Sequence, residues 1–137
     1  MGFVVFYVAT MLVVPAVMLV CGWFMKNKPP KKINGWVGYR TPRSTKNMDT
    51  WLFAHKLCGV LFLRYGLWAA AGSLAAAVGS LCIFGENVQG VVLITVLLLQ
   101  TVVLLVPVYD VEMKLKETFD ENGNLITGET DDANRKP

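Results

Sequence analysis

The chain has 137 residues, of which 54% are apolar or aromatic and only 17% are charged. Soluble domains carry charge on about a quarter of their residues, so this chain has too little polar surface for a water-exposed globule. The composition of the chain as a whole also excludes a disordered protein and, with three cysteines, a disulfide scaffold. It predicts a small integral membrane protein.

Three long apolar stretches divide the chain. Residues 3–25 give 23 positions without a charge, residues 88–108 give 21, and residues 57–84 give 28 with one charge, Arg64. A hydrocarbon core about 30 Å thick needs about 20 helical residues, so each stretch is long enough to span it. We predict an all-α integral membrane protein with three transmembrane helices, at about 3–25, 60–84 and 88–108.

The first stretch has an alternative reading as a cleaved signal peptide. Such a peptide starts with basic residues and has a short apolar core, whereas Met1-Gly2-Phe3 has no basic residue and the apolar run is long. Lysines follow it directly, as in a stop-transfer sequence. We therefore expect an uncleaved helix within a single membrane module over residues 1–127, followed by a flexible cytoplasmic tail over 128–137.

The charges of the connecting segments predict the orientation. Residues 26–56 carry eight basic side chains against one acid, whereas residues 85–90 carry no Lys or Arg. The positive-inside rule then places the 26–56 loop and the C-terminus in the cytoplasm and the N-terminus outside. Residues 109–137 carry eight acids and four bases, so we expect this acidic tail to meet the basic loop in one folded cap.

The second helix has several possible starts and a face of small residues. Ser44, Thr45 or Asn47 can cap its N-terminus. A helical extension over residues 47–64 is expected near the lipid headgroups.

Small residues four apart, Gly66/Ala70 and Gly72/Ala76, let neighbouring helices approach closely. This predicts that the second helix is the centre of the bundle. The alternative is a surface for a homo-oligomer.

Gln100 and Arg64 stand out among the polar residues inside the apolar stretches. Gln100, near the middle of the third span, is expected to form a hydrogen bond with a neighbouring helix. Arg64 lies where the second span begins. There, snorkelling to the lipid phosphates is favoured over a functional charge inside the membrane.

Patterns typical of enzymes are missing from the sequence. The cysteines lack metal-site spacing, and the single histidine, His55, has no Ser/His/Asp or paired-carboxylate context. A lone helical histidine is more often a structural, hydrogen-bonded residue. Phosphate-binding loops and dinucleotide fingerprints are absent as well. We expect no enzymatic activity, no metal, no cofactor and no nucleic-acid partner.

The richest set of polar and aromatic residues lies around the start of the second helix. Two arginines next to a helix N-terminus can bind a phosphate or carboxylate, although a basic loop can also simply neutralise anionic lipid. Two glycines and a proline favour a specific backbone shape. The candidate ligand- or partner-binding residues, with Arg64 added, are Asn34, Gly38, Tyr39, Arg40, Thr41, Pro42, Arg43, Ser44, Asn47, Trp51, His55 and Arg64.

This string resembles the SdpI family of bacterial membrane proteins. The resemblance rests on Gly38-Tyr39-Arg40-Thr41-Pro42 with Ser44, Asn47, Trp51 and Ala54-His55, and on the ending Phe119-Asp120 to Gly123-Asn124. It covers about residues 1–126. The founding member has further spans before this module, confers immunity to a secreted toxin and holds a repressor at the membrane.

The resemblance implies a protein of the bacterial cytoplasmic membrane that acts in toxin immunity or membrane signalling. Its GYRTP loop (residues 38–42) would bind a peptide toxin or a cytoplasmic regulator. The alternative is a small transporter or a lipid- or anion-binding protein, in which the same loop binds anionic headgroups. A membrane enzyme is disfavoured because no nucleophile, acid–base pair or metal set is present.

Overall fold

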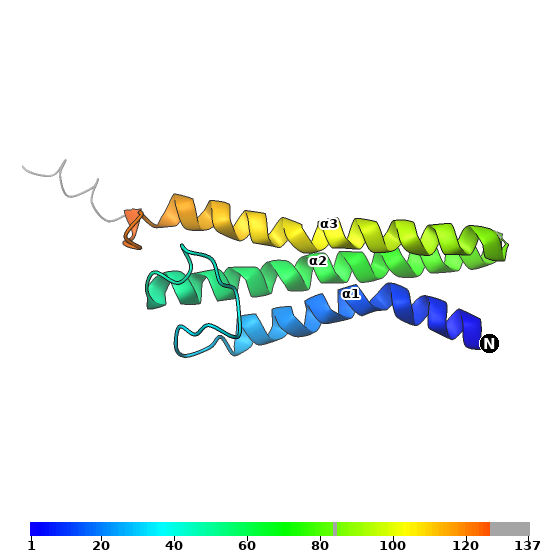
Figure 1. Ribbon diagram of the computed structural model, residues 1–137, viewed down its shortest axis with the longest axis horizontal. Coiled ribbons are helices and arrows are strands. Elements are labelled where there is room, and N and C mark those ends of the chain that lie inside the picture. The colour runs from blue at the N-terminus through cyan, green and yellow to red at the C-terminus, as the bar shows by residue number, and fades with distance from the viewer. Residues whose placement is uncertain (84, 127–137) are drawn as a thin grey trace, which may run out of the picture.

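The computed structural model describes residues 1–83 and 85–126, with only the backbone of residues 86 and 87. These residues form three helices, α1 (Gly2–Asn27), α2 (Met48–Ile83) and α3 (Glu86–Thr118), which lie side by side in a long bundle (Figure 1). The predicted end of the second span at residue 84 and the predicted flexible tail over 128–137 lie outside the described residues.

All three helices are long and apolar enough to cross a membrane, which confirms the predicted all-α architecture. Their outward side chains are mostly apolar, as the exposed Trp68 and Leu98 illustrate. With 36 and 33 residues, α2 and α3 are about 54 and 50 Å long, well beyond a hydrocarbon core of about 30 Å. The excess length carries a polar end, opposite the N-terminus of α1 (Figure 1).

Helix α2 lies between α1 and α3, as predicted (Figure 1). Two glycines set the closest approach of α1 and α2. A Cβ added to Gly22 would lie 2.9 Å from the Gly59 carbonyl oxygen, and one added to Gly59 would lie 2.5 Å from the Lys26 nitrogen. The backbones therefore touch at this crossing, which leaves no space for any side chain.

The predicted small-residue pairs behave differently from one another. Gly66 packs against α1, with Met18 Cβ 3.1 Å from the position of an added Cβ. Gly72 has no neighbour within 4 Å of that position, so this glycine forms no close contact between the helices of the bundle.

A set of polar contacts in the middle of the bundle involves Pro15 and Gln100. Pro15 has no N–H, so the Met11 carbonyl loses its helical donor, and α1 bends along its length (Figure 1). Gln100 Nε2 of α3 donates to that carbonyl at 2.7 Å and to Ser73 Oγ of α2 at 2.6 Å. This confirms that Gln100 binds a neighbouring helix. One side chain thereby joins all three helices in the region where lipid offers no hydrogen bonds.

The Gly22–Gly59 crossing predicts a large difference between two Gly→Ala substitutions on α2. Gly59→Ala overpacks the crossing and should lower the free energy of unfolding by about 1–3 kcal/mol. Gly72→Ala adds its methyl group to open space and should change stability by less than about 0.5 kcal/mol. Titration of the detergent-solubilised protein with SDS, followed by tryptophan fluorescence, measures both. Equal effects would contradict the crossing.

Candidate functional site

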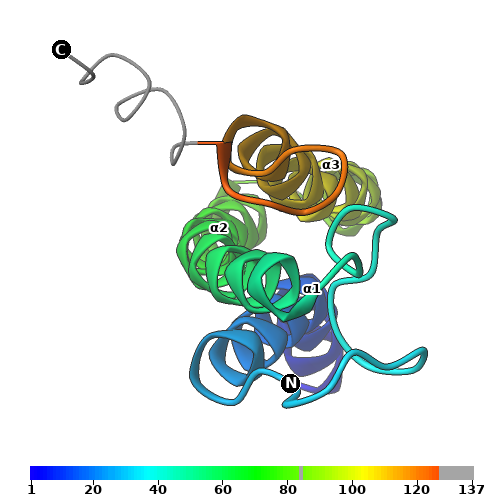
Figure 2. The same cartoon turned by 90° about the vertical axis from the view of Figure 1, so that its left-hand side faces the viewer.

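The predicted site residues, apart from Arg64, lie at the polar end of the bundle. Residues 28–47 leave α1, run along one side of the bundle towards α3 and return to the start of α2 (Figure 2). Residues 119–126 fold back beyond α3, beside Asn47. We call residues 28–47 and 119–126, together with the helix ends they contact, the polar cap.

The GYRTP loop is anchored on His55, which is fully buried in α2. The Tyr39 N–H donates to His55 Nε2 at 3.0 Å, so the ring proton resides on Nδ1, which donates to the Trp51 carbonyl at 2.8 Å. Gly38 has a φ of +110°, and a Cβ there would lie only 2.0 Å from His55 Nε2. Only glycine fits this position, both for its conformation and for space.

The Tyr39 side chain ties the same loop to α3. Its hydroxyl group lies 3.0 Å from the Val108 carbonyl oxygen and 3.4 Å from Glu112 Oε2, and donates its hydrogen to one of the two. Burial, followed by the nearby Glu112 carboxylate, raises the pKa of the Tyr39 phenol above its usual range, which keeps it a donor. Arg43 Nε lies 3.6 Å from Glu112 Oε1. The sequence did not single out Glu112. The opposite charges of the loop and the tail were the only feature of the sequence that indicated such a contact.

Thr41, Pro42 and Ser44 build one helical turn by reciprocal capping. The Thr41 N–H donates to Ser44 Oγ at 2.8 Å, and the Ser44 N–H donates to Thr41 Oγ1 at 3.2 Å. Pro42 occupies the first position of the turn, where a missing N–H costs nothing. The buried Ser44 hydroxyl donates to the carbonyl of Tyr39 or Thr41, both 3.2 Å away. These three residues thus give the loop its shape.

Asn47 repeats this capping at the start of α2. Its Oδ1 accepts the Thr50 N–H at 3.0 Å, and Thr50 Oγ1 accepts the Asn47 N–H at 3.2 Å. Of the three predicted capping residues, Asn47 is therefore the one that caps α2. Its Nδ2 also donates to the Gly123 carbonyl at 2.7 Å. The Thr50 N–H, which an anion at this helix end would bind, is thus taken by the protein itself.

The turn after α3 is shaped by Asp120 and Gly123. Asp120 Oδ1 accepts the backbone N–H groups of Asn122 and Asn124, each at 2.8 Å, and the N–H of Asn124 chiefly lowers the pKa of the Asp120 carboxyl. Gly123 has a φ of +87° and packs on Asn47. Basic loop and acidic tail therefore do form one cap, as expected, although hydrogen bonds contribute more contacts to it than ion pairs do.

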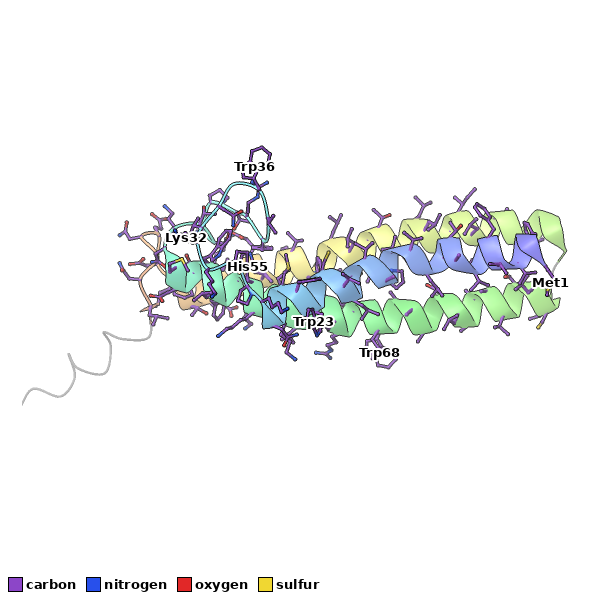
Figure 3. The ribbon with its side chains drawn as sticks, turned by 90° about the horizontal axis from the view of Figure 1, so that it is seen from below. Met1, Trp23, Lys32, Trp36, His55 and Trp68 are labelled. Atoms are coloured by element: carbon purple, nitrogen blue, oxygen red, sulfur yellow. The ribbon has the colours of Figure 1, made fainter. Side chains whose placement is uncertain are left out.

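Trp51 and Asn34 hold the first half of the loop. The buried Trp51 donates from Nε1 to the Pro30 carbonyl at 3.0 Å and packs its ring on His55. Asn34 Oδ1 accepts the N–H groups of Trp36 and Val37, at 3.0 and 2.8 Å. Trp36, 93% exposed, projects away from the bundle (Figure 3). Tryptophan is favoured at the interface between lipid and water, so an exposed Trp36 suits a loop beside the membrane.

The structure does not bring two predicted site residues into this network. Arg40 is exposed, and no described residue forms a hydrogen bond or ion pair with its side chain. Its Nη1 atom lies 3.9 Å from the place that a Cβ on Gly35 would take. Arg64 is exposed on α2, nine residues or about 14 Å along the helix from His55.

Fold and site together define a small multi-pass membrane protein, with a hydrogen-bonded polar cap that presents one arginine. A family model described as the SdpI/YfhL protein family matches residues 31–109, more than half of the chain. The chain belongs to this family. The match takes in α2, most of α3 and the loop from residue 31, and is shorter than the expected resemblance over residues 1–126. No curated protein and no solved structure matches the chain.

The contact between Gly38 and His55 predicts a selective effect of substitution in the loop. Gly38→Ala would force the loop off the imidazole and break the Tyr39 N–H bond to Nε2, whereas a Cβ at Gly35 would meet only the end of the Arg40 side chain, at an ordinary contact distance of 3.9 Å. Because His55 is the single histidine, ¹⁵N NMR of its ring reports this directly. The Nε2 signal should shift strongly in Gly38→Ala and stay unchanged in Gly35→Ala. An unshifted signal in Gly38→Ala would refute the anchor.

Proposed function

We propose that this chain acts in toxin immunity or membrane signalling in the bacterial cytoplasmic membrane. It binds a peptide toxin or a cytoplasmic regulator through the GYRTP loop, with Arg40 as the principal contact. The observation that carries this proposal is the division of labour within the loop. Gly38, Tyr39, Thr41 and Pro42 shape or anchor the backbone, whereas the exposed Arg40 side chain has no such task.

The anchors on either side of Arg40 support this proposal. Tyr39 is fixed to α2 and α3, and Thr41 begins a capped turn, so the Arg40 backbone is held before any partner arrives. Such preorganisation lowers the entropy that binding costs. A guanidinium group binds a carboxylate or phosphate through two parallel hydrogen bonds. A binding function fits better than a catalytic one, because the buried polar groups of the cap are engaged with one another.

The proposed orientation has this face in the cytoplasm. Eight basic side chains in residues 26–56 favour that placement, with the N-terminus outside. A cytoplasmic regulator would reach Arg40 directly, whereas a secreted peptide toxin would first have to reach the cytoplasmic side of the membrane.

Arg40→Ala should abolish most of the protection that the chain gives, while membrane insertion and abundance stay normal. Cells that lack the chain are complemented with the wild type or a variant and challenged with secreted membrane-active peptides. Survival is then compared with the amount of protein in the membrane. The matched control is Lys46→Ala, which removes another exposed cation close by. If both variants protect like the wild type, the Arg40 contact is ruled out.

Arg40→Lys separates bidentate recognition from simple charge. Lysine keeps the charge but lacks the planar fork, so this variant should behave like Arg40→Ala in the same assay. A lysine variant with full activity would leave a role for charge but not for a bidentate contact.

The second candidate function is a small transporter or a lipid- or anion-binding protein. A cavity of about 310 Å³ favours this function. Apolar residues of α1 and the loop line the cavity and suit a lipid chain, and Lys28, which also lines it together with His55, suits an anionic headgroup. The exposed Ile33, Trp36 and Val37 lie on the same loop. Native mass spectrometry from bilayers of mixed phosphatidylglycerol and phosphatidylcholine would test it. Retention of phosphatidylglycerol that is lost in Lys28→Ala would support this function over the first.

A further inference from the structure

The loop that leaves α1 has an exposed apolar tip, residues 33–37. Trp36 is 93% exposed, Val37 65% and Ile33 39%. The side chain of Asn34 holds this tip in a turn, because its Oδ1 accepts the backbone N–H groups of Trp36 and Val37. Exposed apolar side chains that are grouped beside polar ones are typical of surfaces that bind a membrane or a protein.

The tip lies beside the bundle and not on top of its polar end. In the view along the bundle axis, this part of the loop extends beyond the outline of the three helices (Figure 2). Trp36 projects sideways from the bundle and is level with His55 along the long axis (Figure 3). The tip therefore overhangs the lipid that surrounds the helices.

The level of His55 along the bundle is that of the lipid headgroups. The second span is predicted to begin at residue 60, which is five residues or about 7.5 Å along α2 from His55. A bilayer about 40–45 Å thick with a hydrocarbon core of about 30 Å has about 5–8 Å of headgroups on each side. On α1, Trp23 is 45% exposed and has Lys28 Nζ 5.4 Å from its ring centroid, as suits a tryptophan at the same boundary. Trp36 therefore reaches the headgroup layer.

The charges around the tip favour anionic headgroups. Residues 31–40 contain Lys31, Lys32 and Arg40, all exposed, and no acidic residue. Basic side chains at the membrane surface attract anionic phospholipids, and tryptophan is enriched at the same depth. A protein partner fits the tip less well. Each partner of a standard protein interface buries about 800 Å², which is more than three apolar side chains can supply.

We propose that residues 31–37 anchor the loop in the lipid headgroup layer, where the apolar tip contacts lipid and Lys31 and Lys32 select anionic phospholipids. The anchor holds the loop from the membrane side, whereas His55 holds it from within the bundle. This inference goes beyond the role proposed for Arg40. It also differs from binding of a lipid in the cavity beside Lys28, because the tip lies on the bilayer surface and encloses no lipid molecule.

Fluorine-labelled tryptophan tests the depth of the tip. The full chain has four tryptophans, so 5-fluorotryptophan gives four ¹⁹F NMR signals, and Trp36→Phe identifies that of Trp36. The chain is placed in phosphatidylglycerol nanodiscs that contain a lipid with a nitroxide at either its headgroup or its chain end. The headgroup label should broaden the Trp36 signal several-fold more than the chain-end label does. Trp68, 72% exposed inside the second span, should show the reverse order. Any other order at Trp36, or no broadening, would overturn the anchor.

Substitution of the two lysines tests the selection of lipid. Broadening of the Trp36 signal by the headgroup label should fall at least about twofold when phosphatidylcholine replaces phosphatidylglycerol. The double variant Lys31→Gln, Lys32→Gln should lose this difference between the lipids, whereas Lys46→Gln, which removes an exposed cation outside the tip, should keep it. Equal broadening of the wild type in both lipids, or an unchanged difference in the double variant, would refute selection by these lysines. Protection from a toxin enters none of these readouts, so the anchor and the function of Arg40 fail separately.

Discussion

Every backbone polar group that loses its helical partner away from water must find a side chain, and this constraint shapes the whole chain. In the middle of the bilayer, Pro15 leaves the Met11 carbonyl without its helical donor, and Gln100 Nε2 donates a hydrogen bond to that carbonyl instead. In the polar cap, the Tyr39 N–H finds His55. The Thr41 N–H finds Ser44 in the same way. The residues that stand out in the sequence as polar or conformationally special are mostly the ones that meet this demand.

The gross fold follows from the sequence because hydrophobic length is a local property. Runs of 21 to 28 residues specify spanning helices wherever they fall, and Asn47 marks a helix start by its own chemistry. Packing is not local. Which glycines touch depends on how each helix is rotated, so Gly22 and Gly59 meet, whereas Gly72, equally small and equally well spaced, faces open space. That Gln100 binds another helix could be predicted, but not that its acceptor is the Met11 carbonyl.

The polar cap shows the same division between local and long-range information. The sequence groups Gly38 to His55 correctly because they lie within 18 residues of each other, and most of them do meet. Glu112 could not be foreseen, since it is 73 residues from Tyr39 and looks like any other acid of a solvated tail. Arg43 is another example. The sequence made it a candidate for binding an external anion, whereas in the structure it faces the Glu112 carboxylate of the same chain.

The polar groups that have no partner within the described part of the chain say more about binding than the motif as a whole does. At the polar cap that group is the Arg40 guanidinium; at mid-bilayer depth it is Gln100 Oε1. One is a donor beside water, where a bond is worth little unless it is bidentate and preorganised. The other is an acceptor in hydrocarbon, where the lack of a donor is costly because lipid chains supply none.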